Sequence, residues 1–360
     1  MSQPRIGVVG GGLCGTMAAL TLRSRGLQPT ILNEAQRSLG GRLAGGVRHP
    51  DSGAQFFRAS EAGSQWASVL AMLAREGLVA PWTGRFGLLG ARGGFLPREV
   101  LGSTPLGAML KEDSASASGG VDFCGFLAGA EQPVLVGTPS NGSICDGICA
   151  AAAIDVRLRS RVLDATPLAR GGWRLAVERA ATSERAGPPT TEHMEFDALI
   201  VATHDARLAA GAVASLATGD EAAGARLQQL SEALVRQREE STAAVFTWSA
   251  YFPIGTSAKL PFDAVTAPSS SIVHFAARDA SKPGRPPARE LPPSHRSQPT
   301  GVPVRSTLQG ELWTAVPKPD PNPNLSPDPN AGLQGELWTA VSKPGFAQVL
   351  RGATLECQIH

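Results

Sequence analysis

The chain has 360 residues, of which 42% are hydrophobic and 18% charged, and its formal net charge is +2. A chain of this length can bury a large core as one connected unit or as two domains. The small net charge argues against nucleic acid or an anionic membrane as a partner, and no apolar run reaches the length of about 18 residues that predicts a membrane span.

The first apolar run begins at Ile6, which leaves no room for a signal or transit peptide, so a cytoplasmic location is expected. The five cysteines follow no metal-ligand or disulfide-scaffold spacing. Cys145 and Cys149 have the spacing of one helix face, and we expect them to be two small buried thiols and no metal site. A reducing compartment fits this usage.

The first elements in chain order predict a βαβ unit. Residues 6–9 predict a buried strand, Leu13, Met17 and Leu20 then recur at helical spacing, and residues 30–33 predict a second strand. Strand, helix and strand within so short a stretch are typical of a parallel sheet. We therefore expect an α/β fold of Rossmann type.

Further elements follow with less regular spacing. They are a helix over 61–76, a small antiparallel meander of strands from 154 to 178, an apolar strand over 196–202 suited to the centre of a sheet, and a helix over 220–240. Residues 84–136 are glycine-rich, and no element is assigned to them.

The last part of the chain differs in composition. Nearly half of the 28 prolines lie between Pro283 and Pro329, so we expect most of this stretch to be loop or disordered. The segment LQGELWTAV occurs at 308–316 and again at 333–341. Two copies are too few for a solenoid, and a local duplication or a faulty gene model explains them better. At most one copy is expected to occupy a strand.

Residues 10–15, GGGLCG, satisfy the G-x-G-x-x-G pattern of a dinucleotide-binding turn. Gly10 permits the tight turn, Gly12 lets the backbone approach a pyrophosphate, and Gly15 lets the helix pack closely on the strand. The N–H groups at the helix start, which include those of Leu13 and Cys14, suit phosphate oxygens.

An acidic residue and a second glycine pair follow this turn. Glu34 ends the second strand about 20 residues later, where a carboxylate accepts both ribose hydroxyls and repels a 2′-phosphate. In the segment RSLGGR over 37–42, Gly40 and Gly41 allow a second loop to approach the cofactor. Arg42 offers a planar fork for phosphate oxygens. A domain that binds a nicotinamide dinucleotide does not need this second contact with the phosphates, whereas a domain that binds the FAD pyrophosphate does.

The glycine turn, Glu34 and R-x-x-G-G-R together resemble the FAD-dependent amine oxidase superfamily. Later segments resemble its renalase-like NAD(P)/FAD-dependent oxidoreductases: SGAQFFRA (52–59), PWTGRFGLL (81–89), GGWRLAVE (171–178), FDALIVATHDA (196–206) and ARDASKPGRP (277–286). The resemblance covers about residues 4–285 with some gaps.

The resemblance implies a Rossmann-type FAD-binding domain, with a parallel sheet and an antiparallel meander, and a smaller mixed α+β substrate domain. It assigns 1–80 and 137–215 to the FAD-binding domain and 81–136 and 216–280 to the substrate domain. Residues 281–360 are left as a proline-rich tail.

The resemblance also implies further cofactor contacts. Gly53, Ala54, Gln55 and Phe56 would line the isoalloxazine ring, and the backbone of Val162 would contact the adenine. Without the resemblance, Gln55 and Phe56 are ordinary loop and core residues, and Val162 is part of a strand core.

Three more positions are interpreted through the same comparison. Ala202 and Thr203 would end the strand that returns to the cofactor. His204 stands where the family usually has proline, and we expect a loop residue there and no catalytic base. Arg37 is expected to be a surface charge or a partner for Glu34.

The function implied is an FAD-dependent oxidoreductase that accepts hydride from a reduced nicotinamide-type or related small donor and passes electrons to molecular oxygen. No nucleophile motif or metal-spaced cluster is present in the sequence, and no catalytic residue is assigned. Gln55 is the candidate polar group near the reactive edge of the flavin.

Other functions stay open. An amine oxidase acting on a small amine is the alternative, although an aromatic content of 5% with Tyr251 as the one tyrosine counts against it. A carotenoid-type desaturase is a further option, but nothing suggests a long apolar tunnel. A non-catalytic remnant is the third, since no glycine- and acid-containing FAD segment of the family follows Phe346.

Overall fold

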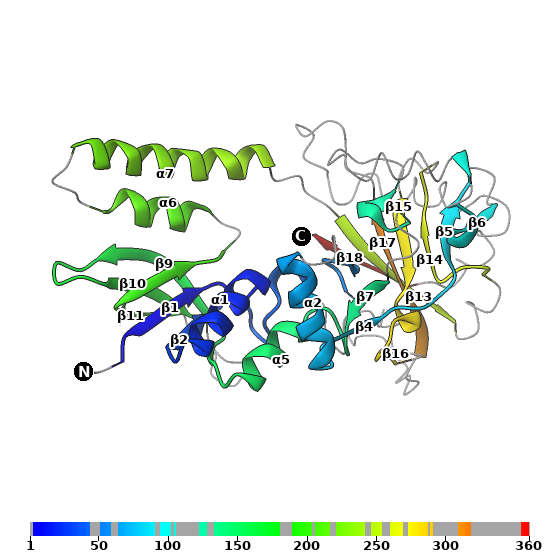
Figure 1. Ribbon diagram of the computed structural model, residues 1–360, viewed down its shortest axis with the longest axis horizontal. Helices are drawn as coiled ribbons and strands as arrows, with labels where there is room; N and C mark the ends of the chain where they lie inside the picture. The colour runs from blue at the N-terminus through cyan, green and yellow to red at the C-terminus, as the bar shows by residue number, and fades with distance from the viewer. Residues whose placement is uncertain are drawn as a thin grey trace, which may run out of the picture. The chain divides into compact units, whose positions relative to one another are not determined.

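The computed structural model describes residues 3–43, 51–58, 64–90, 94–101, 104–105, 122–127, 133–180, 189–203, 206–216, 221–241, 246–253, 260–268, 273–286, 289–290, 309–317 and 354–359. The chain divides into two compact units, Met1–Ala44 with Gly142–Thr242 and Gly45–Asn141 with Ala243–His360. Figure 1 labels most of the elements of both units.

The first unit contains a four-stranded parallel sheet with the strand order β12-β1-β2-β8. Its strands are β1 (Arg5–Val9), β2 (Gln28–Leu32), β8 (Asp155–Arg157) and β12 (Ala198–Val201). Residues 6–9 of β1 are all buried, as expected for a parallel strand that is covered on both faces. The predicted Rossmann-type α/β fold is confirmed.

Two sequence expectations about these strands were wrong. The strand predicted for the sheet centre is β12, which stands at one end of the described strand order and is half-buried. An apolar run cannot by itself separate a central strand from an edge strand. The first strand expected in the meander is β8, which instead extends the parallel sheet through the pairing of Thr30 with Asp155.

The antiparallel meander itself is confirmed and lies one strand further along the chain. Its order is β11-β10-β9, formed by β9 (Ser160–Pro167), β10 (Trp173–Arg179) and β11 (Thr190–Phe196). Leu175 and Val177 on β10 are fully buried and pack with Val9 and Leu32 of the parallel sheet. This shared core joins the two sheets of the first unit.

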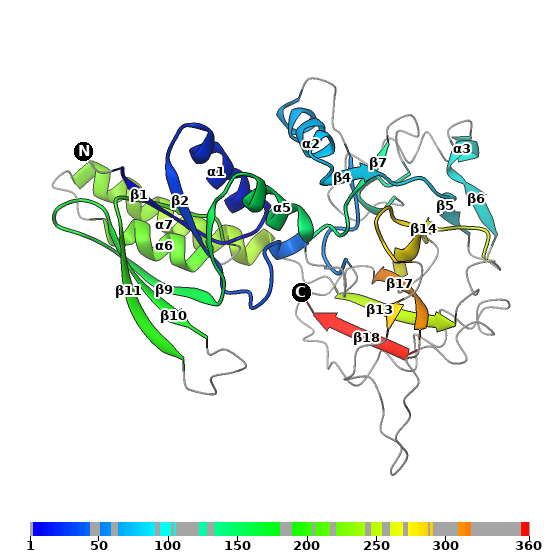
Figure 2. The same cartoon turned by 90° about the horizontal axis from the view of Figure 1, so that it is seen from below.

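Four helices complete the described part of the first unit: α1 (Leu13–Ser24), α5 (Ser143–Ala151), α6 (Ala206–Ala214) and α7 (Glu221–Ser241). The helix predicted over 220–240 is thus confirmed as α7. It runs beside α6, where Ser231 Oγ donates to the Ala210 carbonyl oxygen at 3.0 Å (Figure 2).

The second unit contains a mixed sheet with the order β18-β13-β17-β15-β14-β5-β6, with β16 paired to β17, and a small sheet β3-β7-β4. The strands are β3 (Phe57–Arg58), β4 (Val79–Pro81), β5 (Phe86–Leu89), β6 (Phe95–Pro97), β7 (Val134–Gly137), β13 (Phe246–Pro253), β14 (Ala264–Thr266), β15 (Val273–Arg278), β16 (Arg289–Glu290), β17 (Gln309–Pro317) and β18 (Thr354–Ile359). The short helical segments are η1 (Gly41–Leu43) in the first unit and α3 (Arg98–Leu101), η2 (Phe123–Gly125) and η4 (Asp279–Ser281) in the second.

The helix predicted over 61–76 is confirmed as α2 (Gln65–Arg75) in the second unit. Its N-cap residue Ser64 accepts a hydrogen bond from the Ala67 N–H through its side chain. It ends before Gly77, whose φ of +70° favours glycine.

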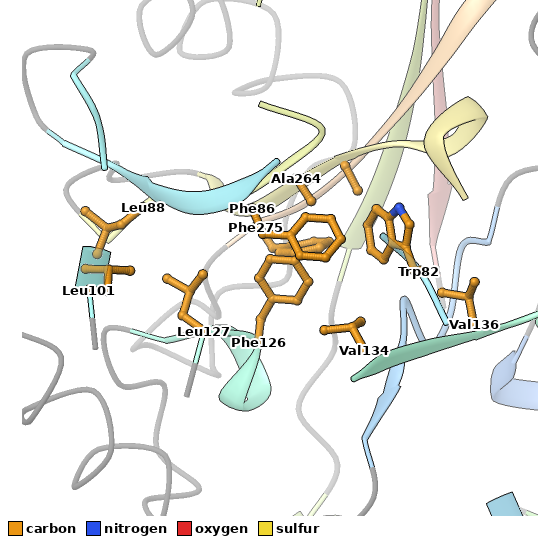
Figure 3. Close-up of a cluster of buried hydrophobic side chains, with 11 residues drawn as sticks. Trp82, Phe86, Leu88, Leu101, Phe126, Leu127, Val134, Val136, Ala264 and Phe275 are labelled. Carbon is orange, nitrogen blue, oxygen red and sulfur yellow. The ribbon is translucent and has the colours of Figure 1, made fainter. Parts of the chain in front are cut away.

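Aromatic side chains form the core of the second unit (Figure 3). Phe126 and Phe275 are fully buried with their ring centroids 4.9 Å apart, and Trp82 and Phe86 pack beside them. Burying each such ring contributes about 1.5–3 kcal/mol. Phe86 and Phe126 come from the stretch over 84–136, to which the sequence alone assigned no element, whereas Phe275 lies on β15.

The proline-rich stretch contains a strand in one copy of the repeated segment, as the sequence analysis allowed. β17 holds the first copy of LQGELWTAV and pairs with both β13 and β15. The physical reason is local, because residues 308–316 contain no proline to interrupt a ladder. The second copy, at 333–341, lies outside the described residues.

The bounds of the compact units differ from those of the predicted domains. Residues 45–80 fall in the second unit and 216–242 in the first. The assignment of one part to FAD and the other to substrate stays a prediction. Within the described residues, no helix combines the length and apolarity that crossing a membrane requires.

Candidate dinucleotide-binding site

The glycine turn lies between β1 and α1, and two of its glycines are required by packing. Gly10 has a φ of +104°, and a Cβ on it would lie 2.6 Å from the Ala202 carbonyl oxygen. A Cβ on Gly15 would lie 1.9 Å from the Gly10 carbonyl oxygen. Both are contacts with backbone atoms that cannot move aside, so the turn keeps this shape only with glycine.

Gly12 is different, because the protein leaves space around it. A Cβ there would meet nothing closer than Gly40 O at 3.9 Å and Gly41 Cα at 4.0 Å. Gly12 is also the N-cap of α1 and supplies no side-chain cap. The first N–H groups of the helix therefore have no intrahelical acceptor, and an anion can approach them.

The second glycine pair lies directly on the turn. Gly40 donates its N–H to Gly11 O at 2.9 Å and forms a parallel bridge with Gly12. Gly41 has a φ of +53°, and a Cβ on it would lie 3.2 Å from Gly12 Cα. The structure thus brings together the two glycine motifs that the sequence singled out.

Arg42 follows on η1 and is exposed, whereas its neighbour Leu43 is buried and anchors the segment. Across the residues described, the Arg42 guanidinium makes neither a hydrogen bond nor an ion pair. The side chain is therefore available to a phosphate. Leu39 N–H donates to Asp146 Oδ1 at 3.0 Å. This hydrogen bond holds the residues that precede Arg42 against helix α5.

Glu34 lies two residues after the end of β2 with its side chain 63% exposed, and Arg161 Nε is 3.9 Å from its Oε2. Arg161 is 64% exposed and precedes Val162 on β9, so Glu34 and the predicted adenine contact belong to the same unit. Arg37 is exposed, and the charge that meets Glu34 is that of Arg161.

The sequence analysis missed Asn33, the residue before Glu34. Its Oδ1 accepts the Gly11 N–H at 3.1 Å, and its Nδ2 is buried without a partner in the described part of the chain. Asn33 thus fixes the middle of the glycine turn from the side of β2. The one feature of the sequence that could have indicated this role is the amide side chain at the end of the strand predicted over 30–33.

Ala202 follows β12, and its N–H donates to Val9 O at 2.8 Å, at the end of β1 directly before the turn. Thr203 comes next and is half-buried. His204 lies outside the described residues. Tyr251 is on β13, but its side chain is not among those described.

The four residues expected beside the flavin ring belong to the second unit. Gln55 is 3% exposed; its Nε2 donates to Asp51 O at 2.5 Å and to Gly53 O at 3.0 Å. Ala54 O accepts the Asn141 Nδ2 hydrogen at 2.6 Å. The ring of Phe56 packs on the aromatic core, 5.1 Å from that of Phe126.

Asp51 begins this loop and carries a buried charge. Burial by itself would raise the pKa of Asp51, but the charges of Lys282 and Arg285 and the Asn141 N–H lower that pKa below its ordinary value. Asp51 is therefore ionised in the folded protein at neutral pH.

Cys145 and Cys149 are buried on α5, as predicted. Burial raises the pKa of Cys145 to about 12 and that of Cys149 to about 11. Both are neutral thiols at physiological pH. No group of three potential metal-ligating side chains occurs among the residues that the structure describes.

Comparison with known proteins supports the dinucleotide interpretation of the first unit. Residues 8–73 match the family described as NAD(P)-binding Rossmann-like domain. This match includes the glycine turn, Glu34 and the second glycine pair. No curated protein sequence gives a significant match to the chain.

Solved structures share the fold at low sequence identity. A putative protoporphyrinogen oxidase from Exiguobacterium sp. 255-15 is 14% identical with a TM-score of 0.57, covering 99% of this chain and 86% of its own. An oxidoreductase from Methanosarcina mazei is 12% identical with a TM-score of 0.56, covering 99% and 87%. A putrescine oxidase mutant redesigned in cofactor binding is 12% identical with a TM-score of 0.50, covering 88% and 76%. These likenesses show a common fold.

Proposed function

We propose that the chain is an FAD-dependent oxidoreductase and that FAD binds at the glycine turn of the first unit. The observation that carries the proposal is the contact between Gly12 and Gly40, which places two glycine motifs together and leaves space above Gly12. A mononucleotide or a single phosphate needs only one such turn. A pyrophosphate has oxygens for the helix N–H groups and for Arg42.

The residues of this site have distinct binding roles. The N–H groups of Leu13 and Cys14 and the guanidinium of Arg42 would hold the pyrophosphate. Glu34 would accept the ribose hydroxyls in place of its long and exposed contact with Arg161. The backbone of Val162 on β9 would contact the adenine.

Bound FAD would supply the redox chemistry, taking hydride from a reduced nicotinamide-type or related small donor and passing electrons to molecular oxygen. The protein would bind, orient and shield the reactants. No acid or base is assigned to the reaction, since hydride transfer does not require one. That Gly53–Phe56 line the flavin ring stays a prediction of the family resemblance.

Anaerobic reduction of the FAD-loaded chain tests the donor class. Bleaching of the visible flavin absorption by dihydronicotinamides, with no bleaching by small amines, is expected. Bleaching by amines alone would favour the amine oxidase. A folded chain that takes up no FAD would overturn both and leave a non-catalytic protein.

A further inference from the structure

An interior strand of the larger sheet in the second unit is formed by a segment that occurs twice in the chain. β17 pairs with β13 on one side and with β15 on the other, and we call its place between them the β17 position. All but the last residue of β17 belong to the copy of LQGELWTAV at 308–316. An identical copy follows at 333–341. The sheet therefore has one β17 position for two identical segments.

The backbone pairing of the β17 position suits either copy. The ladders to β13 and β15 join backbone groups, and each residue of the first copy has an identical counterpart in the second, as Thr339 has for Thr314. The copies differ at the last position of the strand, where Pro317 is opposite Val273 and the counterpart is Ser342. Because serine has the backbone N–H that proline lacks, this difference removes no donor from the ladder.

The lengths of the neighbouring connections also suit either copy. With the first copy in the β17 position, residues 291–308 follow β16 and residues 318–353 lead to β18. With the second copy, these connections would be 291–333 and 343–353. One connection lengthens while the other shortens by a similar factor, and the entropy of loop closure changes slowly with length. Loop closure therefore favours one arrangement over the other only about twofold.

The shorter connection can still reach β18. β17 and β18 both run antiparallel to β13, so they are parallel to each other with β13 between them. A crossover between parallel strands needs about a dozen residues, and 343–353 has about this length. The second arrangement is therefore possible without any change in the order of the strands.

We propose that the two copies of LQGELWTAV alternate in the β17 position, so that the folded chain has two arrangements. The proline-rich spacer over 318–332 follows the strand in one arrangement and precedes it in the other. Both copies are tethered to the same sheet through β16 and β18, which favours alternation within one chain over pairing with a second chain. This conformational device goes beyond the proposed function and needs no cofactor.

Proline substitutions in the full-length chain test the alternation, because proline removes a ladder hydrogen bond and is excluded from the interior of a sheet. Thr314 is paired with Ser249 on β13 and with Ala277 on β15, so Thr314→Pro excludes the first copy from the β17 position. Thr339→Pro excludes the second copy. Each single variant should unfold within about 2 °C of wild type, since the other copy takes the position. The double variant should unfold about 10 °C lower.

Hydrogen exchange followed by mass spectrometry measures how often each copy occupies the β17 position. Peptides that extend to Pro317 or to Ser342 distinguish the two copies. In the wild-type chain, each copy should be protected in about one third to two thirds of the molecules, and the two fractions should be complementary. Thr339→Pro should raise the protected fraction of the first copy to nearly all molecules, and Thr314→Pro should do the same for the second.

Ser326→Pro is the matched control, since it adds a proline to the spacer and leaves both copies unchanged. It should alter neither the unfolding temperature nor the protected fractions. A Thr314→Pro variant as unstable as the double variant would show that only the first copy fits and would overturn the proposal. A double variant as stable as wild type would overturn it too. A Thr314→Pro variant that folds only as a dimer in sedimentation equilibrium would assign the second copy to another chain and overturn alternation within one chain.

Discussion

Gly40 donates its N–H to the carbonyl oxygen of Gly11 at 2.9 Å, and this hydrogen bond joins the two glycine-rich segments of the first unit. The parallel bridge between Gly12 and Gly40 continues the contact. A pyrophosphate bound above Gly12 would therefore meet both segments at once. A side chain added at a glycine of these segments should weaken binding without destabilising the fold only where the protein leaves space around that glycine.

Gly12→Ala and Gly15→Ala should separate binding from folding. A methyl group at Gly12 enters open space, so the free energy of unfolding should change by no more than about 1 kcal/mol. It occupies the place of the phosphate, however, and should raise the Kd for FAD at least tenfold. At Gly15 the methyl group meets the Gly10 carbonyl oxygen and should destabilise the protein by about 3 kcal/mol.

Urea unfolding and FAD titration of the two variants provide the measurements. Wild-type affinity in a folded Gly12→Ala protein would contradict the proposed position of the pyrophosphate.

Arg42→Met should weaken FAD binding without a loss of stability. The guanidinium is exposed and unpaired within the described residues, so the free energy of unfolding should change by less than about 0.5 kcal/mol. A lost charge-assisted hydrogen bond to a phosphate corresponds to about 1.5–3 kcal/mol, or at least a tenfold rise in Kd. Arg37→Met, in the same segment and equally exposed, is the control and should bind as wild type does.

Asn33→Leu should destabilise the first unit by about 1–3 kcal/mol, because the Gly11 N–H loses its acceptor in a part-buried position. Asn33→Asp keeps an acceptor oxygen and should recover most of that loss. Denaturant unfolding followed by circular dichroism measures both. Equal losses in the two variants would show that the hydrogen bond to Gly11 is not the cause.

The stability of the protein should fall in acid because of Asp51. The pKa of this carboxyl is lower in the folded than in the unfolded state, so its contribution is complete above about pH 4 and is lost as the pH falls through the folded pKa. Asp51→Asn leaves Lys282 and Arg285 without their shared anion and should cost about 3–5 kcal/mol at neutral pH. Unfolding measured from neutral to acidic pH should show a shallower acid dependence in Asp51→Asn than in wild type.

The glycine turn and its surroundings were predictable because the determinants are local. Gly15 is required by its contact with the Gly10 carbonyl oxygen and Gly10 by its own φ of +104°, and Glu34 follows at a spacing that a βαβ unit fixes. The long helix over 220–240 could be found from its composition, which is also a local property. The place of β12 at one end of the described strand order could not be predicted, because strand order depends on pairing with strands far along the chain.

The buried charges of the second unit lay beyond sequence reasoning. Lys282 and Arg285 pair with Asp51 across more than 230 residues, and nothing in the local pattern around any of them predicts burial. The motif ARDASKPGRP was noticed only as a resemblance. For β17, the sequence allowed one copy of the repeated segment to occupy a strand, but two identical copies could not indicate which one.

Titration of the purified full-length chain with FAD, followed by visible absorption and flavin fluorescence, tests the central claim most directly. The proposed site predicts one FAD per chain with a Kd below about 1 μM, or about −8 kcal/mol, and a loss of at least tenfold in the Gly12→Ala variant. A folded wild-type chain that takes up no FAD, or a Gly12→Ala variant that binds it equally well, would contradict the account.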